Sequence, residues 1–276
     1  MKSLQNIPAF LFIAILLFSC SAGKNNVASI ASPGSAPITI RVMSYNIHHA
    51  NPPSKPGLID IQAIANVIKA QSPDLVALQE VDVNTNRSGS GLNQATEIAK
   101  LTGMKVVFGK AINYDGGEYG VAILSKYDFS QTNNLPLPTA EGTNGERRTL
   151  LSATIHLPGK RKIVFASTHL DAQRNDTNRI LQITKVNEYF SEEKLPVILA
   201  GDLNARPDSR VINKLDNLFT RSCFTNCPNT SPSVNARSVI DYISYISPMI
   251  STLDHRVINE EYASDHLPVV ADLQIK

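Results

Sequence analysis

The segment Pro196-Val-Ile-Leu-Ala-Gly-Asp-Leu-Asn204 places an apolar run directly before an aspartate and an asparagine. Residues 196–200 are continuously apolar, which is typical of a strand buried on both faces of an α/β protein. Ligand sites in such proteins collect where strands end. The segment therefore predicts a layered α/β fold with a polar site at the end of this strand.

Strand-like and helical segments alternate along the rest of the chain. Residues 38–45 alternate and are rich in β-branched side chains, whereas residues 58–70 carry apolar residues at helical spacing. Further strands are expected at 74–78, 105–108, 121–124, 149–156, 163–167, 239–246, 252–258 and 268–275, and further helices at 93–101 and from Asn175 or Asp176 to Phe190. No repeat or charge run divides this pattern, which predicts one α/β domain over residues 38–276.

The composition excludes several classes of protein. The chain has 276 residues, of which 42% are hydrophobic and 18% charged, and its mean hydropathy is −0.09. These values exclude a disordered protein, a collagen-like repeat and a coiled coil. The net charge of +2 is too balanced to indicate nucleic-acid binding by itself.

The N-terminal segment has the pattern of an export signal. Lys2 precedes an apolar stretch over residues 8–18, which is too short to cross a bilayer but fits a secretory signal peptide. The ending Leu17-Phe-Ser-Cys20 resembles a bacterial lipoprotein signal, so we expect residues 1–19 to be removed and Cys20 to be lipidated; an ordinary signal peptide is the alternative. Residues 20–37 are small and polar and predict a flexible tether. We expect an exported, membrane-anchored protein at the outer membrane or periplasm of a Gram-negative cell.

Cys223 and Cys227 are the two remaining cysteines and lie close together in Ser222-Cys-Phe-Thr-Asn-Cys-Pro228. Close cysteines in an exported protein favour a local disulfide. A zinc site would need two more soft ligands, and no further cysteine or nearby histidine supplies them.

Polar side chains follow the predicted strands repeatedly. They are Asn46, Glu80, His169, Asp202, Asn204, Asp241, Asp265 and His266. One such residue commonly serves a turn, but so many at strand ends indicate one convergent site. Their hard oxygen donors suit Mg²⁺ or Mn²⁺, with Ca²⁺ as a further candidate, rather than a structural zinc ion.

Six short motifs occur in the order found in the endonuclease/exonuclease/phosphatase superfamily, which the chain resembles. They are Ser44-Tyr-Asn46, Leu78-Gln-Glu80, Ser167-Thr-His169, Gly201-Asp-Leu-Asn204, Ile240-Asp-Tyr-Ile243 and Ser264-Asp-His266. The resemblance implies a four-layer α/β sandwich of the deoxyribonuclease I type, with two mixed sheets packed face to face and helices outside. It also implies metal-dependent hydrolysis of phosphoester bonds.

The resemblance assigns a role to each strand-end residue. Glu80 is the implied central metal ligand, with Asn46 and Asp265 beside it. Asp202 is implied to orient or deprotonate the attacking water. Asn204 is two residues further along an extended segment and can donate a hydrogen bond to the phosphoryl group.

The histidines are expected to face the phosphate. Asp241 is implied to orient the imidazole of His266 and to raise its basicity, although a plain structural salt bridge is the alternative. His169 resembles the second imidazole of the nuclease and sphingomyelinase branches, which contacts a phosphoryl oxygen or assists the leaving group.

Three further residues are candidates for lining the substrate site. Tyr119 and Arg148 occupy places where related enzymes put phosphate-contacting groups, and surface roles are the alternative. Strand alternation puts His48 on the same side as Asn46, although two adjacent histidines also suit a turn.

Other polar residues near these motifs are assigned to the cleft or to the surface. Asp171 and Arg206 are expected to line the cleft. Arg174 and Arg179 are expected on the surface of the helix that follows His169.

These observations predict a hydrolase that cleaves phosphodiesters rather than phosphomonoesters. Its substrate is expected to be a nucleic acid or a phospholipid headgroup, so nuclease and phospholipase C or sphingomyelinase-like activities are alternatives, and no obligate protein partner is evident. The second signature of inositol polyphosphate 5-phosphatases is absent, since the chain contains no tryptophan. A catalytically silent binding protein on this fold is the alternative from another class.

Overall fold

The computed structural model describes Met1 and residues 36–276. The predicted signal peptide, the lipidation site at Cys20 and residues 20–35 of the predicted tether lie outside the described residues. The first strand begins at Ile38. Within residues 36–276, no helix combines the length and apolar character that a membrane span requires.

The domain contains two six-stranded sheets. The first sheet has the order β11 (Ile250–Val257), β12 (Val269–Ile275), β1 (Ile38–Asn46), β2 (Leu75–Val83), β4 (Gly117–Ser125) and β3 (Lys105–Tyr114). The second has the order β5 (Phe129–Leu137), β6 (Arg148–His156), β7 (Lys162–His169), β8 (Val197–Asp202), β10 (Asp241–Ile246) and β9 (Thr220–Arg221). Both sheets are mixed, because β1 and β2 are parallel, as are β7 and β8, whereas the other pairs are antiparallel.

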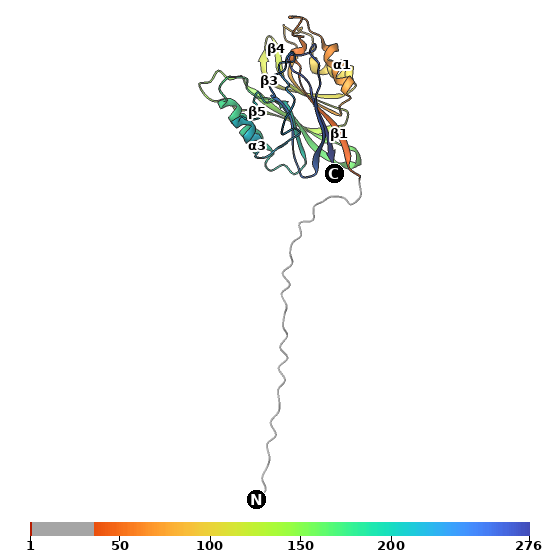
Figure 1. Cartoon of the computed structure of the whole chain (residues 1–276), viewed down its shortest axis with the longest axis vertical. Helices are drawn as coiled ribbons and strands as arrows, with labels where there is room; N and C mark the ends of the chain where they lie inside the picture. Colours follow the sequence, from red (N-terminus) through yellow and green to blue (C-terminus); the bar gives the residue numbers. More distant parts are fainter. Residues whose placement is uncertain (2–35) are drawn as a thin grey trace. The chain divides into compact units, whose positions relative to one another are not determined.

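Helices cover the outer face of each sheet (Figure 1). Buried side chains of α1 (Ile61–Gln71) and α2 (Gln94–Thr102) share an apolar cluster with β1, β2 and β4. Those of α3 (Thr177–Phe190) and α4 (Arg210–Leu215) share another with β6, β7 and β8. A third cluster, which includes Phe165, fills the space between the sheets. The four-layer α/β sandwich implied by the sequence resemblance is therefore confirmed.

Some elements differ from the sequence predictions. Strand β5 was not predicted, because its sequence FSQTNNLPL is mostly polar and contains a proline. The structure explains this composition, since β5 is an edge strand whose polar side chains face solvent. Helix α4 was also missed, because six residues are too few to show a helical period.

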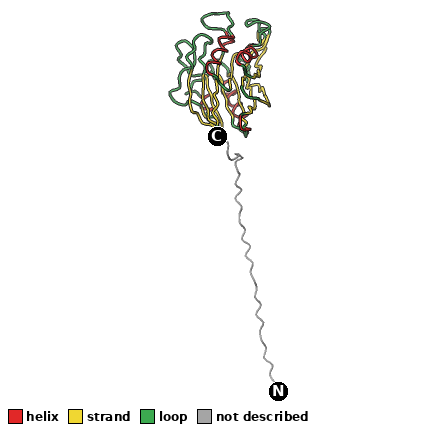
Figure 2. The backbone as a smooth tube through the Cα atoms, turned by 90° about the vertical axis from the view of Figure 1, so that its right-hand side faces the viewer, coloured by secondary structure: helices red, strands yellow, loops and turns green. Residues whose placement is uncertain are grey.

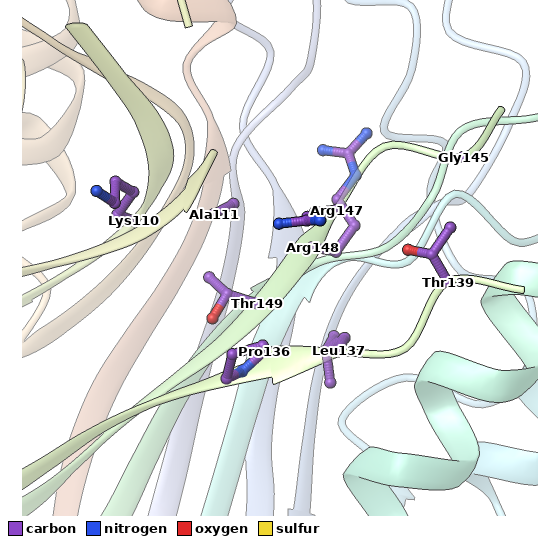
Figure 3. A pocket seen from close by; sticks show the side chains of 9 residues that line it. All are labelled: Lys110, Ala111, Pro136, Leu137, Thr139, Gly145, Arg147, Arg148 and Thr149. Atoms are coloured by element: carbon purple, nitrogen blue, oxygen red, sulfur yellow. The ribbon is translucent and has the colours of Figure 1, made fainter. Parts of the chain in front are cut away.

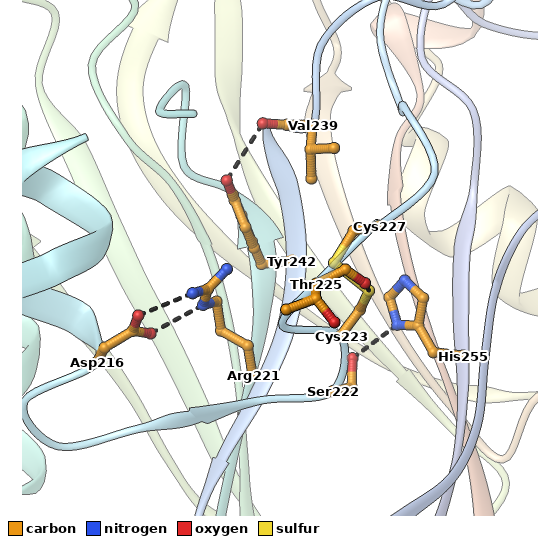
Figure 4. Close-up of a disulfide and its surroundings, with 9 residues drawn as sticks. All are labelled: Asp216, Arg221, Ser222, Cys223, Thr225, Cys227, Val239, Tyr242 and His255. Atoms are coloured by element: carbon orange, nitrogen blue, oxygen red, sulfur yellow. Dashed lines mark hydrogen bonds and ion pairs between the residues drawn. A yellow bond between two sulfur atoms is a disulfide. The ribbon is translucent and has the colours of Figure 1, made fainter. Parts of the chain in front are cut away.

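A disulfide joins Cys223 and Cys227 in the loop between β9 and β10 (Figure 4). The neighbouring Ser222 hydroxyl lies 2.8 Å from Nδ1 of His255 on β11. The disulfide therefore closes a small loop next to the point where Ser222, which follows β9, contacts β11 of the other sheet.

Replacing both cysteines with serine is expected to lower the free energy of unfolding by about 2 kcal/mol, the loop-closure value for a loop of this size. Urea unfolding monitored by circular dichroism measures this difference. Equal unfolding midpoints for the double variant and the oxidised wild type would contradict it.

Candidate active site

The strand-end residues belong to the strand faces that form the core between the sheets. Along β8, Ile198 and Ala200 lie in this core, and the next residue on the same face is Asp202. Ser167 and His169 continue the face of Phe165 on β7 in the same way. The apolar core thus ends in a buried polar layer at the ends of the sheets away from the C-terminus, where long loops gather (Figure 2).

Asp202 lies at the centre of this layer because of the strand register. His169 on β7 and Asp241 on β10 are both directly opposite it. Residues that pair across strands project from the same face, so the three side chains meet. Gly201 permits the close approach of β7 and β8, since a Cβ atom there would lie 2.1 Å from the carbonyl oxygen of Thr168.

A bulge in β2 brings Glu80 to the site. By simple alternation Glu80 would follow Val76 and Leu78 toward the helices on the outer face. The register with β4 shifts between Leu78 and Val81, and Glu80 adopts a left-handed backbone with φ 58°. This bulge directs the carboxylate to Asn46, whose amide nitrogen donates to Glu80 Oε1 over 3.0 Å.

Asn46 connects the two sheets. Its amide nitrogen also donates to Asp202 Oδ2 over 3.1 Å, and its Oδ1 accepts from the backbone N–H of His48. Asn46 therefore holds the carboxylates of Glu80 and Asp202 on either side of one amide group. In this orientation its nitrogen rather than its oxygen faces them.

Asp241, His266 and Asp202 form a buried triad of titratable side chains. His266 Nδ1 lies 2.9 Å from Asp241 Oδ2, and its Nε2 lies 3.8 Å from Asp202 Oδ2. Burial opposes the charged imidazole, but the charge and hydrogen bond of Asp241 outweigh it and raise the pKa of His266 to about 10. Burial and the charge of Asp241 raise the pKa of Asp202.

His169 is held by Arg148 on the neighbouring strand β6. The guanidinium, which can only donate, lies 3.0 Å from His169 Nδ1, so this ring nitrogen accepts. Nε2 lies 3.0 Å from the amide of Asn204 and 3.5 Å from Asp202 Oδ2. Burial, followed by the positive charges of Arg148 and His266, holds the pKa of His169 well below its usual range. His169 is therefore neutral, and because Nδ1 accepts from Arg148, its proton is on Nε2 and faces Asp202 Oδ2. The nearby amide nitrogen of Asn204 is also a donor, so it does not donate to this ring nitrogen.

A local turn fixes Asn204, whereas a contact with the end of β1 fixes the segment that contains Asp265. The backbone N–H of Asn204 donates to Asp202 Oδ1, and Asn204 has a left-handed backbone with φ 47°. Asp265 lies in the segment before β12, where the hydroxyl of Ser264 donates to the carbonyl oxygen of Asn46 over 2.7 Å. This bond ties the segment containing Asp265 to the end of β1.

The carboxylates of Glu80 and Asp265 have the properties of divalent-cation ligands. Both are half-buried, and neither has a basic partner among the described residues. Asp202, Asp241 and His266 also lie within 4.8 Å of one another, close enough to hold a metal. A protonated His266 cannot ligate a cation, however, so the donor chemistry favours Glu80 and Asp265.

Tyr119 and His48, two of the candidates for lining the substrate site, lie in different surroundings. Tyr119 is buried on β4, opposite Asp82 of β2, and burial followed by the charge of Glu80 raises its pKa, so its role in lining the site stays a prediction. His48 does not follow strand alternation, because β1 ends at Asn46 and residues 48–50 form a 3₁₀ turn with positive φ. Its Nδ1 bonds the carbonyl oxygen of Asn51, as a turn residue does.

The residues after His169 correct two expectations. Arg174 precedes α3 and lines a cleft together with Asn204 and Arg206, so it does not lie on the helix. Arg179 is in α3 but is buried, and its guanidinium donates to the carbonyl oxygens of Asp171 and Gln173. Asp171 is buried and accepts from backbone N–H groups, including that of Glu146.

Sequence reasoning missed two residues that complete the site. Glu146 Oε1 lies 3.1 Å from Nη1 of Arg148, and Ser231 Oγ lies 3.5 Å from Nε2 of His266. The acidic residue two positions before Arg148 was the only signal for the first. Ser231 carried none, because its loop comes to His266 only through the tertiary fold.

The model of the Endonuclease/Exonuclease/phosphatase family matches residues 43–266, a range that includes every strand-end residue described above. The chain belongs to this family. The family comprises phosphoester hydrolases that generally depend on a divalent cation, and its fold agrees with the two packed sheets found here.

Solved structures with this fold come from bacteria and from humans. An endonuclease/exonuclease/phosphatase from Beutenbergia cavernae DSM 12333 is 26% identical, with a TM-score of 0.72, and the match covers 86% of this chain and 72% of that one. A mannosyl-6-phosphatase from Bacteroides thetaiotaomicron VPI-5482 is 19% identical (TM-score 0.64; 85% and 99% covered). The human Nocturnin catalytic domain is 22% identical (TM-score 0.66; 86% and 94% covered). Among curated protein sequences, none matches this chain.

Replacing Arg148 with glutamine is expected to lower kcat/KM for a phosphoester about tenfold to a hundredfold, because His169 loses the donor that fixes its tautomer. The pH profile should change as well, since the pKa of His169 is freed from the charge of Arg148. Steady-state hydrolysis between pH 5 and 9 measures both effects.

Lys162→Gln is a matched control for Arg148→Gln, because it removes a positive charge at the exposed far end of the strand that carries His169. It should leave both the rate and the pH profile unchanged. A drop in rate for Arg148→Gln without any change in the pH profile would mean that Arg148 does not act through His169.

Proposed function

We propose that the chain is a divalent-cation-dependent phosphodiesterase that uses a water molecule activated by Asp202. The network from Glu80 through Asn46 to Asp202, His169 and Asn204 carries this proposal. In this network one buried layer holds a carboxylate that we propose as the base, together with hydrogen-bond donors, which suits in-line attack on a phosphate.

Each residue of the layer has one part in the reaction. The raised pKa of Asp202 suits a general base near neutral pH, because a base is most effective when its pKa approaches the working pH. His266, held charged by Asp241, supplies positive charge to the phosphoryl oxygens. The neutral His169 donates from Nε2, and Asn204 is positioned beside it to donate from its amide.

The cation would be held by Glu80 and Asp265, with Asn46 as a third ligand if its amide turns its oxygen inward. Mg²⁺ or Mn²⁺ fits these oxygen donors and would neutralise charge that builds on the phosphate. We favour a diester over a monoester because, among the described residues of this layer, His266 and Arg148 are the only cations, and Arg148 is engaged by His169 and Glu146.

Hydrolysis of bis-p-nitrophenyl phosphate with Mg²⁺ or Mn²⁺ tests the proposal, with p-nitrophenyl phosphate as the monoester comparison. We expect the diester to be the better substrate and a chelator to abolish its hydrolysis, with recovery when the metal is restored. Hydrolysis of neither ester would favour a binding protein on the same fold. A preference for the monoester would point to a phosphatase.

We also propose that the protein is exported and anchored through a lipid on Cys20. The support is the sequence of the N-terminal segment alone. Mass spectrometry of the mature N-terminus after expression in a Gram-negative cell tests this, and an unmodified N-terminus at another residue would contradict it.

A further inference from the structure

The twelve arginines of the chain divide into two groups. Eight of them bond a carboxylate or a backbone carbonyl: Arg41, Arg87, Arg148, Arg161, Arg179, Arg210, Arg221 and Arg256. The other four are exposed, and their guanidinium groups make no hydrogen bond or ion pair with any residue in the described part of the chain: Arg147, Arg174, Arg206 and Arg237.

All four unpaired arginines lie in loops next to active-site residues. Arg147 directly precedes Arg148 (Figure 3), and Arg206 follows Asn204 by two positions. Arg174 lies in the loop after His169, and Arg237 lies in the loop before Asp241. With a net charge of only +2, the chain has no general excess of positive charge to explain this arrangement.

Two of these arginines share one cleft with the active site. Arg174 and Arg206 line it together with Asn204, which in turn contacts His169. The cleft also contains Arg210 and Asp176, which pair with each other, and the exposed Asp208. Arg179 lines the cleft as well, but it is buried, and its Nη1 bonds the carbonyl oxygens of Asp171 and Gln173. Among the described residues, Arg174 and Arg206 are therefore the two exposed cations of the cleft whose guanidinium groups have no partner.

We propose that this cleft binds a second phosphate of the substrate, held between Arg174 and Arg206. This inference rests on the proposed phosphodiesterase activity and specifies its substrate class, a phosphodiester with a further phosphate on one side of the scissile bond. Guanidinium groups match phosphate oxygens in bidentate geometry, and an unpaired pair of them beside the reacting phosphate suits an anionic group better than a neutral one.

Two sources supply this chemistry, an oligonucleotide backbone and a phosphorylated polyol. The first is probed with a thymidine dinucleotide with and without a terminal phosphate. The second is probed with glycerophosphoinositol 4-phosphate and glycerophosphoinositol. In one of the two pairs, the extra phosphate is expected to raise kcat/KM about tenfold or more, and that pair identifies the source.

We expect the ratio of kcat/KM with the extra phosphate to kcat/KM without it to fall stepwise toward one in Arg174→Gln, Arg206→Gln and the double variant. Lys69→Gln removes an exposed charge on α1, in the helix layer that covers the other sheet, and should leave the ratio and the hydrolysis of bis-p-nitrophenyl phosphate unchanged. Calorimetry gives a readout without turnover: thymidine 3′,5′-bisphosphate should bind more tightly than thymidine 5′-monophosphate, and the double variant should lose the difference.

Two results would overturn the inference while leaving the phosphodiesterase activity intact. One is hydrolysis of bis-p-nitrophenyl phosphate with no gain from the extra phosphate in either pair. The other is a gain that the folded double variant retains. If bis-p-nitrophenyl phosphate is not hydrolysed at all, the proposed function itself fails.

Discussion

Replacing Asp202 with asparagine is expected to lower kcat for bis-p-nitrophenyl phosphate about a thousandfold or more, the largest single effect we anticipate. Asparagine keeps the shape of the side chain and can still accept from the backbone N–H of Asn204. It cannot accept a proton from water, so the base that we assign to the reaction is lost. Stopped and continuous assays of p-nitrophenol release measure the effect.

The fold of this variant should survive. Asp202 is buried beside Asp241, and the repulsion between their charges contributes to the raised pKa of Asp202. Removing one of the two charges relieves that repulsion but also removes the Asp202 oxygen that accepts from the amide of Asn46, so thermal unfolding should occur near the wild-type temperature. A variant with normal stability and nearly wild-type kcat would exclude Asp202 as the base.

Replacing Glu80 with glutamine is expected to raise the Mg²⁺ or Mn²⁺ concentration needed for half-maximal activity at least about a hundredfold. Effects of 10- to 100-fold are common for residues that only support a metal ligand, and a direct ligand should exceed them. Glutamine can still accept the hydrogen bond from Asn46, so the bulge in β2 should remain.

A measurement without substrate separates metal binding from catalysis. The wild type should gain thermal stability when the cation is added, because a ligand that binds only the folded state stabilises it. Glu80→Gln should lose that gain. Glu118→Gln, at an exposed salt bridge with Lys110 on the same sheet, is the matched control and should keep it. An unchanged metal requirement for Glu80→Gln would place the cation elsewhere, for example at the triad of Asp202, Asp241 and His266.

The sequence was informative about features that depend on residue type and on the local pattern of apolar and polar residues. The apolar run 196–200 could be recognised as a buried strand, because it is continuous and is followed by glycine and polar residues. Asp202 and Asn204 could be assigned to one site, because a polar residue at the end of such a strand continues a buried face. The exposed strand β5 could not be recognised from the sequence. Its polar residues follow from its position at the edge of a sheet, and only the assembled sheet defines that edge.

His48 and Arg174 show the same limit on the scale of single residues. Strand alternation predicted that His48 lies on the same side as Asn46, which requires β1 to continue past Asn46. The chain turns at Ile47 instead, so this prediction was wrong. Arg174 was assigned to a helix that in fact begins at Thr177, and two or three residues at a helix boundary decide whether a side chain faces solvent or a cleft.

By itself, the sequence determined the layered α/β class and the set of polar residues at the strand ends, because periodicity and residue type are local properties of the chain. Only the tertiary structure decided how those residues meet. Three features join segments that are distant in the chain. They are the bulge that turns Glu80 to Asn46, the register that sets His169 and Asp241 on either side of Asp202, and the burial of His169 beside Arg148, which keeps His169 neutral. Such contacts depend on how the two sheets pack, and a local sequence pattern does not specify which distant segments meet.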